Sequence, residues 1–390
     1  MSGLFVLLAL IPPLAALSPS IVGVVMPLAS LALLVVLLWR GRLRWHWHAP
    51  ISVLLLAVVG LGLASTIWAL DPALAQKKAI KFALVVLPPL WLALALAQID
   101  RPEIRARAAL SLGFGMVLAA LLLAWQTFGE VVLRDAVLGR STPMPGNKTN
   151  VPAAQLAILV WTLPAALAAA GHRGRWLAGV TVVTVGVSVL AGEGLAPCVA
   201  FATGGLTLFF AARWPRLLAG LLLLGVLGFH IASPRLAAME VQAQIIADNS
   251  IRHRMDIWAL AGEYIAERPM LGYGFSNSDR IPAKYGQMTL SGAARVFPLY
   301  PHNVLMQVQV ELGLPGMLLF YSVLVCLIWA CLKAPPPLRA SGLALITATL
   351  SVWCIGYPLW RSAWVGWLLF GAVGMLATIE TRYQAIQHDP

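Results

Sequence analysis

The side chain with the clearest capacity for chemistry in this sequence is that of His302, in the segment Tyr300-Pro301-His302-Asn303, where a long polar stretch gives way to an apolar one. Proline is tolerated at a helix start, and residues 303–310 contain no helix breaker. An imidazole at the entrance of a membrane helix, facing water, could take a proton from a substrate hydroxyl near neutral pH. His302 is therefore a candidate general base, with Asn303 beside it as a candidate substrate contact. An interfacial histidine that only caps the helix is the alternative.

Two arginines precede His302 in the same polar stretch. Arg252 and Arg254 fall near the start of a predicted amphipathic helix, and a guanidinium beside helix N–H groups suits a phosphate or diphosphate. Arg254 lies on the same helical face as Trp258, one turn later, which favours a functional role. For Arg252 a solvated charge or a headgroup contact is the more natural interpretation, although it stays a candidate for substrate binding.

Further candidate substrate-binding residues come from three other polar segments. Lys148 and Asn150 belong to Pro145-Gly-Asn-Lys-Thr-Asn150, where a Gly-Asn turn leading into a helix could present donors to an anion. A lysine that snorkels at a helix start would look the same. Arg361 follows Pro358-Leu-Trp and could join the cationic cluster. Glu193, between two glycines, could orient one of these cations or a sugar hydroxyl.

The composition defines the class of protein. Of 390 residues 60% are hydrophobic and 11% are charged, the mean hydropathy is +0.84, and apolar runs of about 18 or more residues recur. We therefore predict an all-α fold, a polytopic transmembrane helical bundle. The net charge of +12 does not indicate nucleic-acid binding, because the basic residues lie in short loops. No nucleotide-binding loop or cluster of metal-ligating side chains is present in the sequence, so neither a cofactor nor a metal is expected.

About twelve spans are predicted. Residues 1–232 hold the first nine, residues 233–301 form one large, partly helical loop, and residues 302–390 hold the last three. The first run lacks a basic segment and a cleavage site, so it is expected to be a retained span. The predicted spans are 3–17, 21–39, 51–70, 82–98, 108–128, 151–170, 176–190, 195–212, 217–232, 317–332, 343–355 and 363–378.

Glycine and proline residues mark a break in the helix that follows His302, and basic residues indicate the orientation of the whole bundle. Gly313, Pro315 and Gly316 are expected to break or re-aim this helix before the tenth span begins. Clusters of Lys and Arg fall at every second connection between spans, which makes that side cytoplasmic by the positive-inside rule. Both termini are then cytoplasmic, and the candidate residues lie on the opposite face, which in a bacterium with two membranes is the periplasmic one.

The large loop is expected to contain structure of its own. Apolar residues recur at helical spacing through residues 251–265. An amphipathic helix is predicted there, capped by Asn249 or Ser250 and ending before Pro269, and a tight turn at 272–274 follows. An arginine-bearing amphipathic helix combined with a histidine at a helix start favours catalysis over a passive loop.

Three motifs, in this order, resemble those of a known family. They are Arg254-Met-Asp-Ile-Trp258, Arg268-Pro-Met-Leu-Gly-Tyr-Gly274, and His302-Asn-xx-Leu305 with Glu311-Leu-Gly313-Leu-Pro-Gly316. Together with the twelve-span layout and the large loop before the last spans, they resemble the O-antigen ligase/polymerase superfamily of bacterial envelope glycan enzymes. The motifs cover residues 250–316, and the topology extends the resemblance over the whole chain.

The resemblance implies a metal-independent glycosyltransferase that moves a glycan from undecaprenyl diphosphate to an acceptor hydroxyl. The form of this reaction that we expect is the transfer of O-antigen onto lipid A-core. The family's essential histidine maps onto His302, and its arginine before the tryptophan maps onto Arg254, which would bind the diphosphate. Ligases of this family often carry a Ser-Arg pair where this chain has Gly192-Glu193-Gly194. A second cation would then have another source, or the acceptor would differ. The candidates for that cation are Lys148, Arg252 and Arg361.

Other activities stay open at this point. A repeat-unit polymerase or a protein O-oligosaccharyltransferase would use a similar donor, and the length of the product separates a polymerase from a ligase. A lipid or polysaccharide transporter is the rival outside the enzymes. Against it, the sequence shows no internal repeat and no charge buried within a predicted span.

Overall fold

The computed structural model describes residues 2–41, 49–98, 102–128, 149–168, 171–192, 194–243, 245–246, 248–282 and 300–379. Every regular element in these ranges is helical. The α-helices are α1 (Ser2–Leu17), α2 (Val22–Trp39), α3 (Pro50–Ala64), α4 (Pro72–Leu96), α5 (Pro102–Phe128), α7 (Asn150–Leu159), α8 (Leu163–Ala168), α9 (Gly171–Ala191), α10 (Leu195–Ala211), α11 (Pro215–Ala243), α12 (Asn249–Glu267), α13 (Val304–Lys333), α14 (Pro336–Ile355) and α15 (Ser362–Thr378). Short 3-10 turns are η1 (Pro19–Ile21), η2 (Ser65–Ile67), η3 (Val160–Thr162) and η4 (Ser278–Arg280).

The described part of the chain contains nine helical segments that are long and apolar enough to cross a membrane. Three shorter apolar helices, α1, α10 and α15, fall where the first, eighth and last spans are predicted. The predicted polytopic, all-helical membrane fold is therefore confirmed. It stays a prediction that the three shorter helices also cross the membrane. The division of the chain into regions that end at residues 232 and 301 stays a prediction as well.

Several helices extend beyond their predicted spans, because a helix can continue past an apolar stretch into polar sequence. α4 begins at Pro72, well before the predicted start at 82, since the Asp71 side chain accepts a hydrogen bond from the Leu74 N–H at 2.9 Å and caps the helix. α14 begins at Pro336, and α11 continues to Ala243. Hydropathy located these helices but underestimated their lengths.

Glycines let neighbouring helices approach closely within the bundle. A Cβ added at Gly115 of α5 would lie 2.6 Å from the carbonyl oxygen of Ala9 in α1. One added at Gly23 of α2 would lie 2.7 Å from Ser362, at the start of α15. Small residues at helix contacts are typical of membrane bundles, where close backbone packing drives association. The contact at Gly23 places the start of α15, and with it Arg361.

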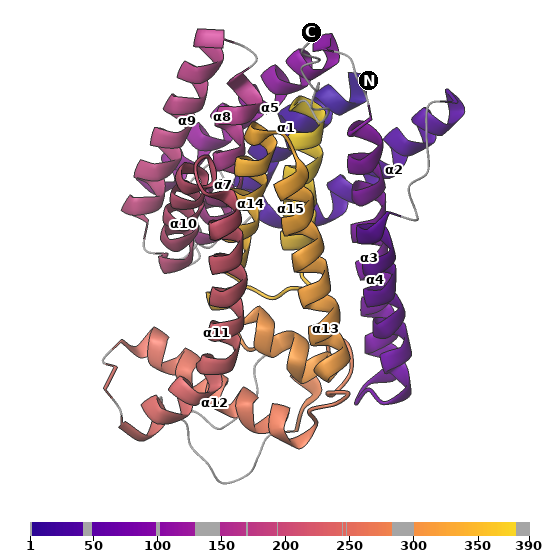
Figure 1. Ribbon diagram of the computed structural model, residues 1–390, viewed down its shortest axis with the longest axis vertical. Coiled ribbons are helices and arrows are strands. Elements are labelled where there is room, and N and C mark those ends of the chain that lie inside the picture. Colours follow the sequence, from indigo (N-terminus) through magenta and orange to yellow (C-terminus); the bar gives the residue numbers. More distant parts are fainter. Residues whose placement is uncertain are drawn as a thin grey trace, which may run out of the picture.

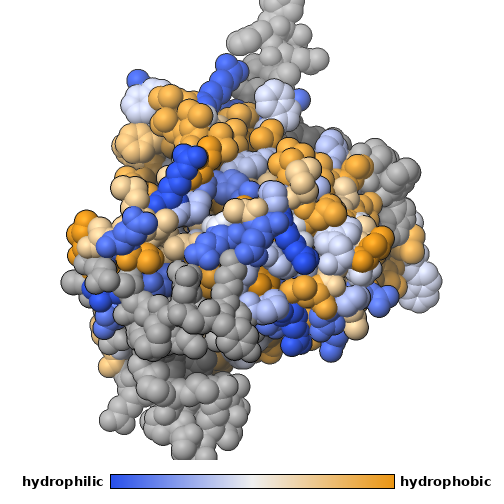
Figure 2. Space-filling view, turned by 90° about the horizontal axis from the view of Figure 1, so that it is seen from below, coloured by the Kyte–Doolittle hydropathy of each residue, from blue (hydrophilic) through white to orange (hydrophobic). Residues whose placement is uncertain are grey.

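α12 lies across the lower end of the molecule in Figure 1, against α11 and α13, while the beginning of α1 and the end of α15 lie at the upper end. Figure 2 shows the lower end face-on. Hydrophilic side chains cross the middle of this face, and hydrophobic side chains surround them along the upper and right margins. The polar surface that α12 helps to form is therefore bordered by surface suited to lipid.

The predicted amphipathic helix is confirmed as α12, which ends at Glu267. The side chain that caps this helix is Asp248, which accepts the capping hydrogen bond at 2.8 Å. Asp248 directly precedes Asn249 and Ser250, the two residues that the sequence predicted as caps. The apolar face of α12, which includes Trp258, is buried against α11 and the first part of α13.

The predicted break after His302 is confirmed as a kink in α13 at Gly313, whose backbone angles (φ 60°, ψ −150°) are not helical. A Cβ at this position would lie 2.3 Å from the carbonyl oxygen of Met270, so only glycine fits. The helix predicted to start directly after His302 is the first half of α13, which begins at Val304, and the kink at Gly313 precedes the predicted start of the tenth span at 317 by a few residues. The kink divides α13 into a short first half, which follows His302, and a long second half.

The chain before α13 supplies partners for carbonyl groups that the kink leaves outside the helical ladder. The Tyr273 N–H donates to the Val310 carbonyl at 2.9 Å, and the Gly274 N–H donates to the Glu311 carbonyl at 2.8 Å. The predicted tight turn is present, with left-handed backbone at Gly272 (φ 66°) and Gly274 (φ 100°) and a 3.1 Å bond from the Gly272 N–H to the Arg268 carbonyl, and it contacts the first half of α13.

Candidate active site

His302 precedes α13 with a left-handed backbone conformation (φ 55°), which costs a non-glycine residue about 1–3 kcal/mol. Its half-buried ring is held by a hydrogen bond between Nδ1 and the carbonyl oxygen of Gly356, at 2.7 Å. Because a carbonyl oxygen only accepts, Nδ1 carries the proton, and in the neutral ring Nε2 has the free lone pair. The arrangement leaves Nε2 available as a base.

The surroundings of His302 favour its neutral form. Burial lowers the pKa of the ring below its ordinary value of 6.5, and the hydrogen bond to Gly356 opposes this shift. The positive charge of Arg254 lowers the pKa further, and His253 acts in the same direction. A neutral imidazole is the form that accepts a proton, so the direction of the shift agrees with the predicted role of His302.

Two guanidinium groups act on the aromatic residues beside His302. The ring centroid of Tyr300 lies 4.4 Å from that of His302. The charges of Arg361 and Arg254 lower the pKa of the Tyr300 hydroxyl, against the larger and opposite effect of burial. Both arginines act in the same direction on Tyr357, whose pKa burial raises to about 12. The fold thus brings together Arg254 from α12, His302 before α13 and Arg361 at the start of α15.

The two arginines of α12 differ in what they contact. Arg254 is half-exposed, and its Nη1 donates to the Ser250 hydroxyl at 3.2 Å, one turn earlier. Arg252 binds the carbonyl oxygen of Ile246 through both Nε, at 3.1 Å, and Nη2, at 2.6 Å. The guanidinium of Arg252 therefore ties the start of α12 to the chain that leaves α11.

Asn303, predicted as a substrate contact, caps α13. Its Oδ1 accepts hydrogen bonds from the N–H groups of Leu305 and Met306, at 3.0 and 3.4 Å, and its Nδ2 donates to the Ser233 hydroxyl at 3.4 Å. The side chain is buried, and these bonds fix the helix start directly after His302 against α11.

The remaining predicted residues lie elsewhere. Asn150 begins α7, and its Oδ1 lies against Gly194, where an added Cβ would come within 2.5 Å of it. Lys148 and Glu193 lie outside the described residues. In the part of the chain that the structure describes, no group of three or more His, Cys, Asp or Glu side chains could hold a metal ion.

A buried polar pair on the first half of α13 was not among the predicted site residues. The Glu311 carboxyl group is 1% exposed, and its partner Gln307 lies one turn earlier. A polar pair at this spacing on an apolar helix is a usable sequence signal, since such residues are costly in a membrane. The expectation that no charged residue is buried within a span is wrong for Glu311, because the candidate membrane segment runs from Val304 to Lys333 rather than from 317. The donors to its carboxyl oxygens are the Ser278 hydroxyl (2.6 Å), the Ser276 N–H (2.8 Å), the Gln307 amide (3.3 Å) and the Trp360 indole N–H.

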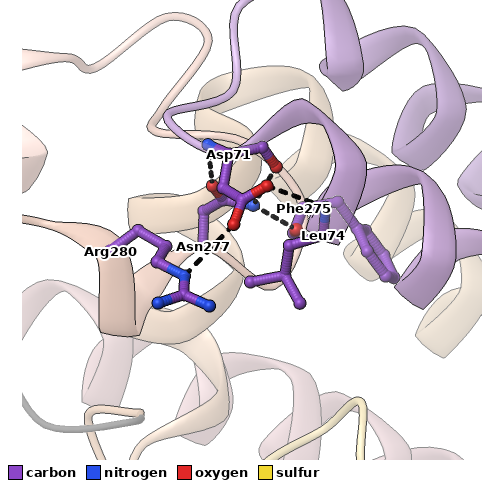
Figure 3. Close-up of polar contacts among 5 residues, drawn as sticks. All are labelled: Asp71, Leu74, Phe275, Asn277 and Arg280. Carbon is purple, nitrogen blue, oxygen red and sulfur yellow. Dashed lines mark hydrogen bonds and ion pairs between the residues drawn. The ribbon is translucent and has the colours of Figure 1, made fainter.

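The chain before α13 is also bonded to the start of α4 (Figure 3). The Asp71 N–H donates to Oδ1 of Asn277 at 2.7 Å, and the Asp71 carboxylate pairs with Arg280, with Nε to Oδ2 at 3.4 Å. The Phe275 N–H donates to the Ser65 hydroxyl at 3.0 Å. The corner between α3 and α4 is thereby fixed to the segment that contacts Glu311.

An apolar cavity of about 330 Å³ lies beside these residues, among α3, α4, α13, α14 and α15. It extends from Leu359 and Trp360, next to Arg361, to Ala334 and Leu338 between α13 and α14. Its lining is almost entirely hydrocarbon, which suits an alkyl or isoprenoid chain rather than a sugar.

The sequence of this chain is similar to those of known proteins. Residues 158–321 match a family model described as O-antigen ligase. Among curated proteins, the chain is 28% identical over 232 residues to a protein of Rickettsia felis, with 55% of each chain covered. It is likewise 28% identical over 231 residues to a protein of Rickettsia conorii, again with 55% of each covered. Both relatives are provisionally named polysaccharide ligases.

The chain matches these relatives over about half of their length. The segment that matches the family model runs from α7 into α13 and contains Arg254, His302 and Glu311. The resemblance of this chain to the O-antigen ligase family, which its three motifs indicate, is therefore confirmed.

Proposed function

We propose that this protein is a glycosyltransferase that moves a glycan from undecaprenyl diphosphate to an acceptor hydroxyl. The reaction that we propose is the transfer of O-antigen onto lipid A-core. The observation that carries the proposal is the His302 ring, which is held through Nδ1 by Gly356 and whose pKa burial and Arg254 lower, with Arg361 acting on its neighbour Tyr300. A base and fixed cations are what a hydroxyl needs to displace a diphosphate from a sugar. The family match supports the same activity.

The transfer is a single displacement at the anomeric carbon. The acceptor oxygen forms a bond to this carbon while the bond from the carbon to the diphosphate oxygen breaks. The hydroxyl proton passes to Nε2 of His302, and the diphosphate leaves with the bonding electron pair. Arg254 and Arg361 stabilise the charge that develops on the leaving group. The configuration at the anomeric carbon is inverted.

Arg361 is the better supported source of the second cation. Its charge acts on Tyr300 and Tyr357, the same aromatic residues that Arg254 influences. Arg252 is directed to the Ile246 carbonyl instead. Arg361 would therefore take the place of the family arginine that is missing where this chain has Glu193, and Lys148 stays a further candidate.

The donor is held by its lipid as well as by its diphosphate. The apolar cavity begins at Leu359 and Trp360, directly before Arg361, so a chain bound there would emerge beside the two cations. In this arrangement α12 and His302 face the periplasm, twelve helical segments span the bacterial inner membrane, and the basic connections at the other end are cytoplasmic.

The test is complementation of a ligase-null strain with the wild type, His302→Ala and His172→Ala, with the lipopolysaccharide ladder on a gel as the readout. His172 is an exposed histidine of α9 and serves as the matched control. The wild type and His172→Ala should restore the ladder, and His302→Ala should not. A ladder from His302→Ala would refute the assignment of His302.

A second arm separates the activities that share a lipid-linked donor. Purified protein is given an undecaprenyl-diphosphate glycan of one defined length and a lipid A-core acceptor. A ligase attaches that length unchanged, a polymerase lengthens the lipid-linked glycan, and a protein oligosaccharyltransferase leaves both unmodified until a protein acceptor is added. Only the first result supports the acceptor proposed here.

A further inference from the structure

We propose that Glu311, together with Gln307, is a positioning residue that keeps the turn between α14 and α15 (residues 356–361) in register with His302. The inference rests on the proposed function. It gives a role to the buried polar pair of α13, which the transfer mechanism does not use.

Both residues of the pair contact this turn directly. Oε1 of Gln307 accepts a hydrogen bond from the Leu359 N–H at 3.0 Å, and the Trp360 indole N–H donates to Oε2 of Glu311. The Gln307 amide in turn donates to Oε1 of Glu311 at 3.3 Å. Two consecutive residues of the turn are therefore fixed to two consecutive turns of one half-helix.

Glu311 is itself held from its other side. The Ser278 hydroxyl and the Ser276 N–H donate to its two carboxyl oxygens at 2.6 and 2.8 Å, and both belong to the chain before α13. The Trp360 ring packs between aromatic rings, with centroids 5.2 Å from Phe82 and 4.3 Å from Phe275. A buried acceptor with this many donors has little freedom to move, because each lost bond would leave a buried polar group unpaired.

The same turn carries two groups of the candidate site. Its first residue, Gly356, accepts the hydrogen bond from Nδ1 of His302, and its last, Arg361, acts on Tyr300. If the middle of the turn shifts, the carbonyl that selects the tautomer of His302 moves relative to the ring. Glu311 thus acts on the transfer through the turn, without contacting the substrate.

The test uses Trp360→Phe, which removes the N–H donor to Glu311 but keeps an aromatic ring between Phe82 and Phe275. Its kcat should fall by about 10- to 10²-fold, since a small misplacement of a catalytic group has effects of this size. Because the bond to Gly356 raises the pKa of His302, its loss should also move the acid limb of the rate profile to lower pH. A change in folding alone would not move that limb.

Trp68→Phe is the matched control. The Trp68 indole N–H donates to the Leu271 carbonyl at 2.9 Å, so the substitution removes the same kind of bond from the neighbouring corner without touching the turn. The control should stay within about two-fold of the wild-type rate. If Trp360→Phe does not fold, Gln307→Met removes the bond to Leu359 at similar side-chain volume and should have the same effect.

A second readout does not depend on any activity. In protein labelled with ¹⁵N-histidine, the His302 signals, assigned by their loss in His302→Gln, should report a proton on Nδ1 in the wild type and a mixture of tautomers in Trp360→Phe. Wild-type signals and rate in Trp360→Phe and Gln307→Met would overturn the positioning role. Absent transfer in every protein, with the tautomer change intact, would overturn the proposed function and leave the positioning role standing.

Discussion

His302 and Gly356, 54 residues apart in the chain, are joined by a 2.7 Å hydrogen bond from the imidazole to the backbone carbonyl. The bond ties the start of α13 to the turn between α14 and α15, and it decides which ring nitrogen is free. It also helps to hold His302 in its left-handed conformation, which the backbone does not favour.

His302→Gln should lower the transfer rate of the purified protein by about 10²–10⁴-fold, the usual contribution of a general base. Glutamine retains a donor for the Gly356 carbonyl, so the turn and the fold should persist. The measurement is transfer from a lipid-linked donor in proteoliposomes, with thermal unfolding in detergent as the control. A wild-type rate would show that His302 has only a structural role.

The transfer rate should rise with pH, and its acid limb should lie at a lower pH than that of an ordinary histidine. The active form of His302 is neutral and its pKa is lowered from 6.5, so the midpoint of the acid limb in kcat/KM should fall below pH 6.5. Arg254→Gln removes a charge that lowers this pKa, and the midpoint should therefore move to higher pH. A midpoint above 6.5 in the wild type would contradict the proposed environment of the ring.

Arg254→Gln and Arg361→Gln should each weaken use of the donor, with KM about 10- to 10²-fold higher, the equivalent of one charge-assisted hydrogen bond. Arg252→Gln should leave the donor KM nearly unchanged. It should instead lower the free energy of unfolding by about 1 kcal/mol, because Arg252 binds the Ile246 carbonyl. Equal effects of all three substitutions on KM would show that the structure does not separate their roles.

Gly313→Ala should destabilise the protein by about 1–3 kcal/mol or more. The substitution places a Cβ at φ 60° and within 2.3 Å of the Met270 carbonyl oxygen. Gly220→Ala in α11 is the control, since an added Cβ there meets nothing within 4 Å. Thermal unfolding in detergent compares the two, and a Gly313→Ala protein as stable as the control would mean that the kink does not require glycine.

Much of the architecture could be predicted from local signals. Hydropathy located the spans, the amphipathic spacing before Pro269 located α12, and the glycines around Pro315 located the kink in α13. Each of these depends on residues close together in the chain, whose effect on the backbone is direct. The prediction was wrong at the start of α4, Pro72, because a cap and a proline can begin a helix in polar sequence outside the lipid.

The sequence motifs identified His302 and Arg254, and the short turn before α15 identified Arg361. None of these patterns specified how close the residues lie to one another. Only the tertiary structure brought Gly356 to Nδ1 of His302 and the Trp360 indole to the buried carboxyl of Glu311. The physical reason is that these contacts join residues about fifty positions apart. They depend on the angle of the kink and on the packing of α14 and α15 against it, which no local pattern of residue types specifies.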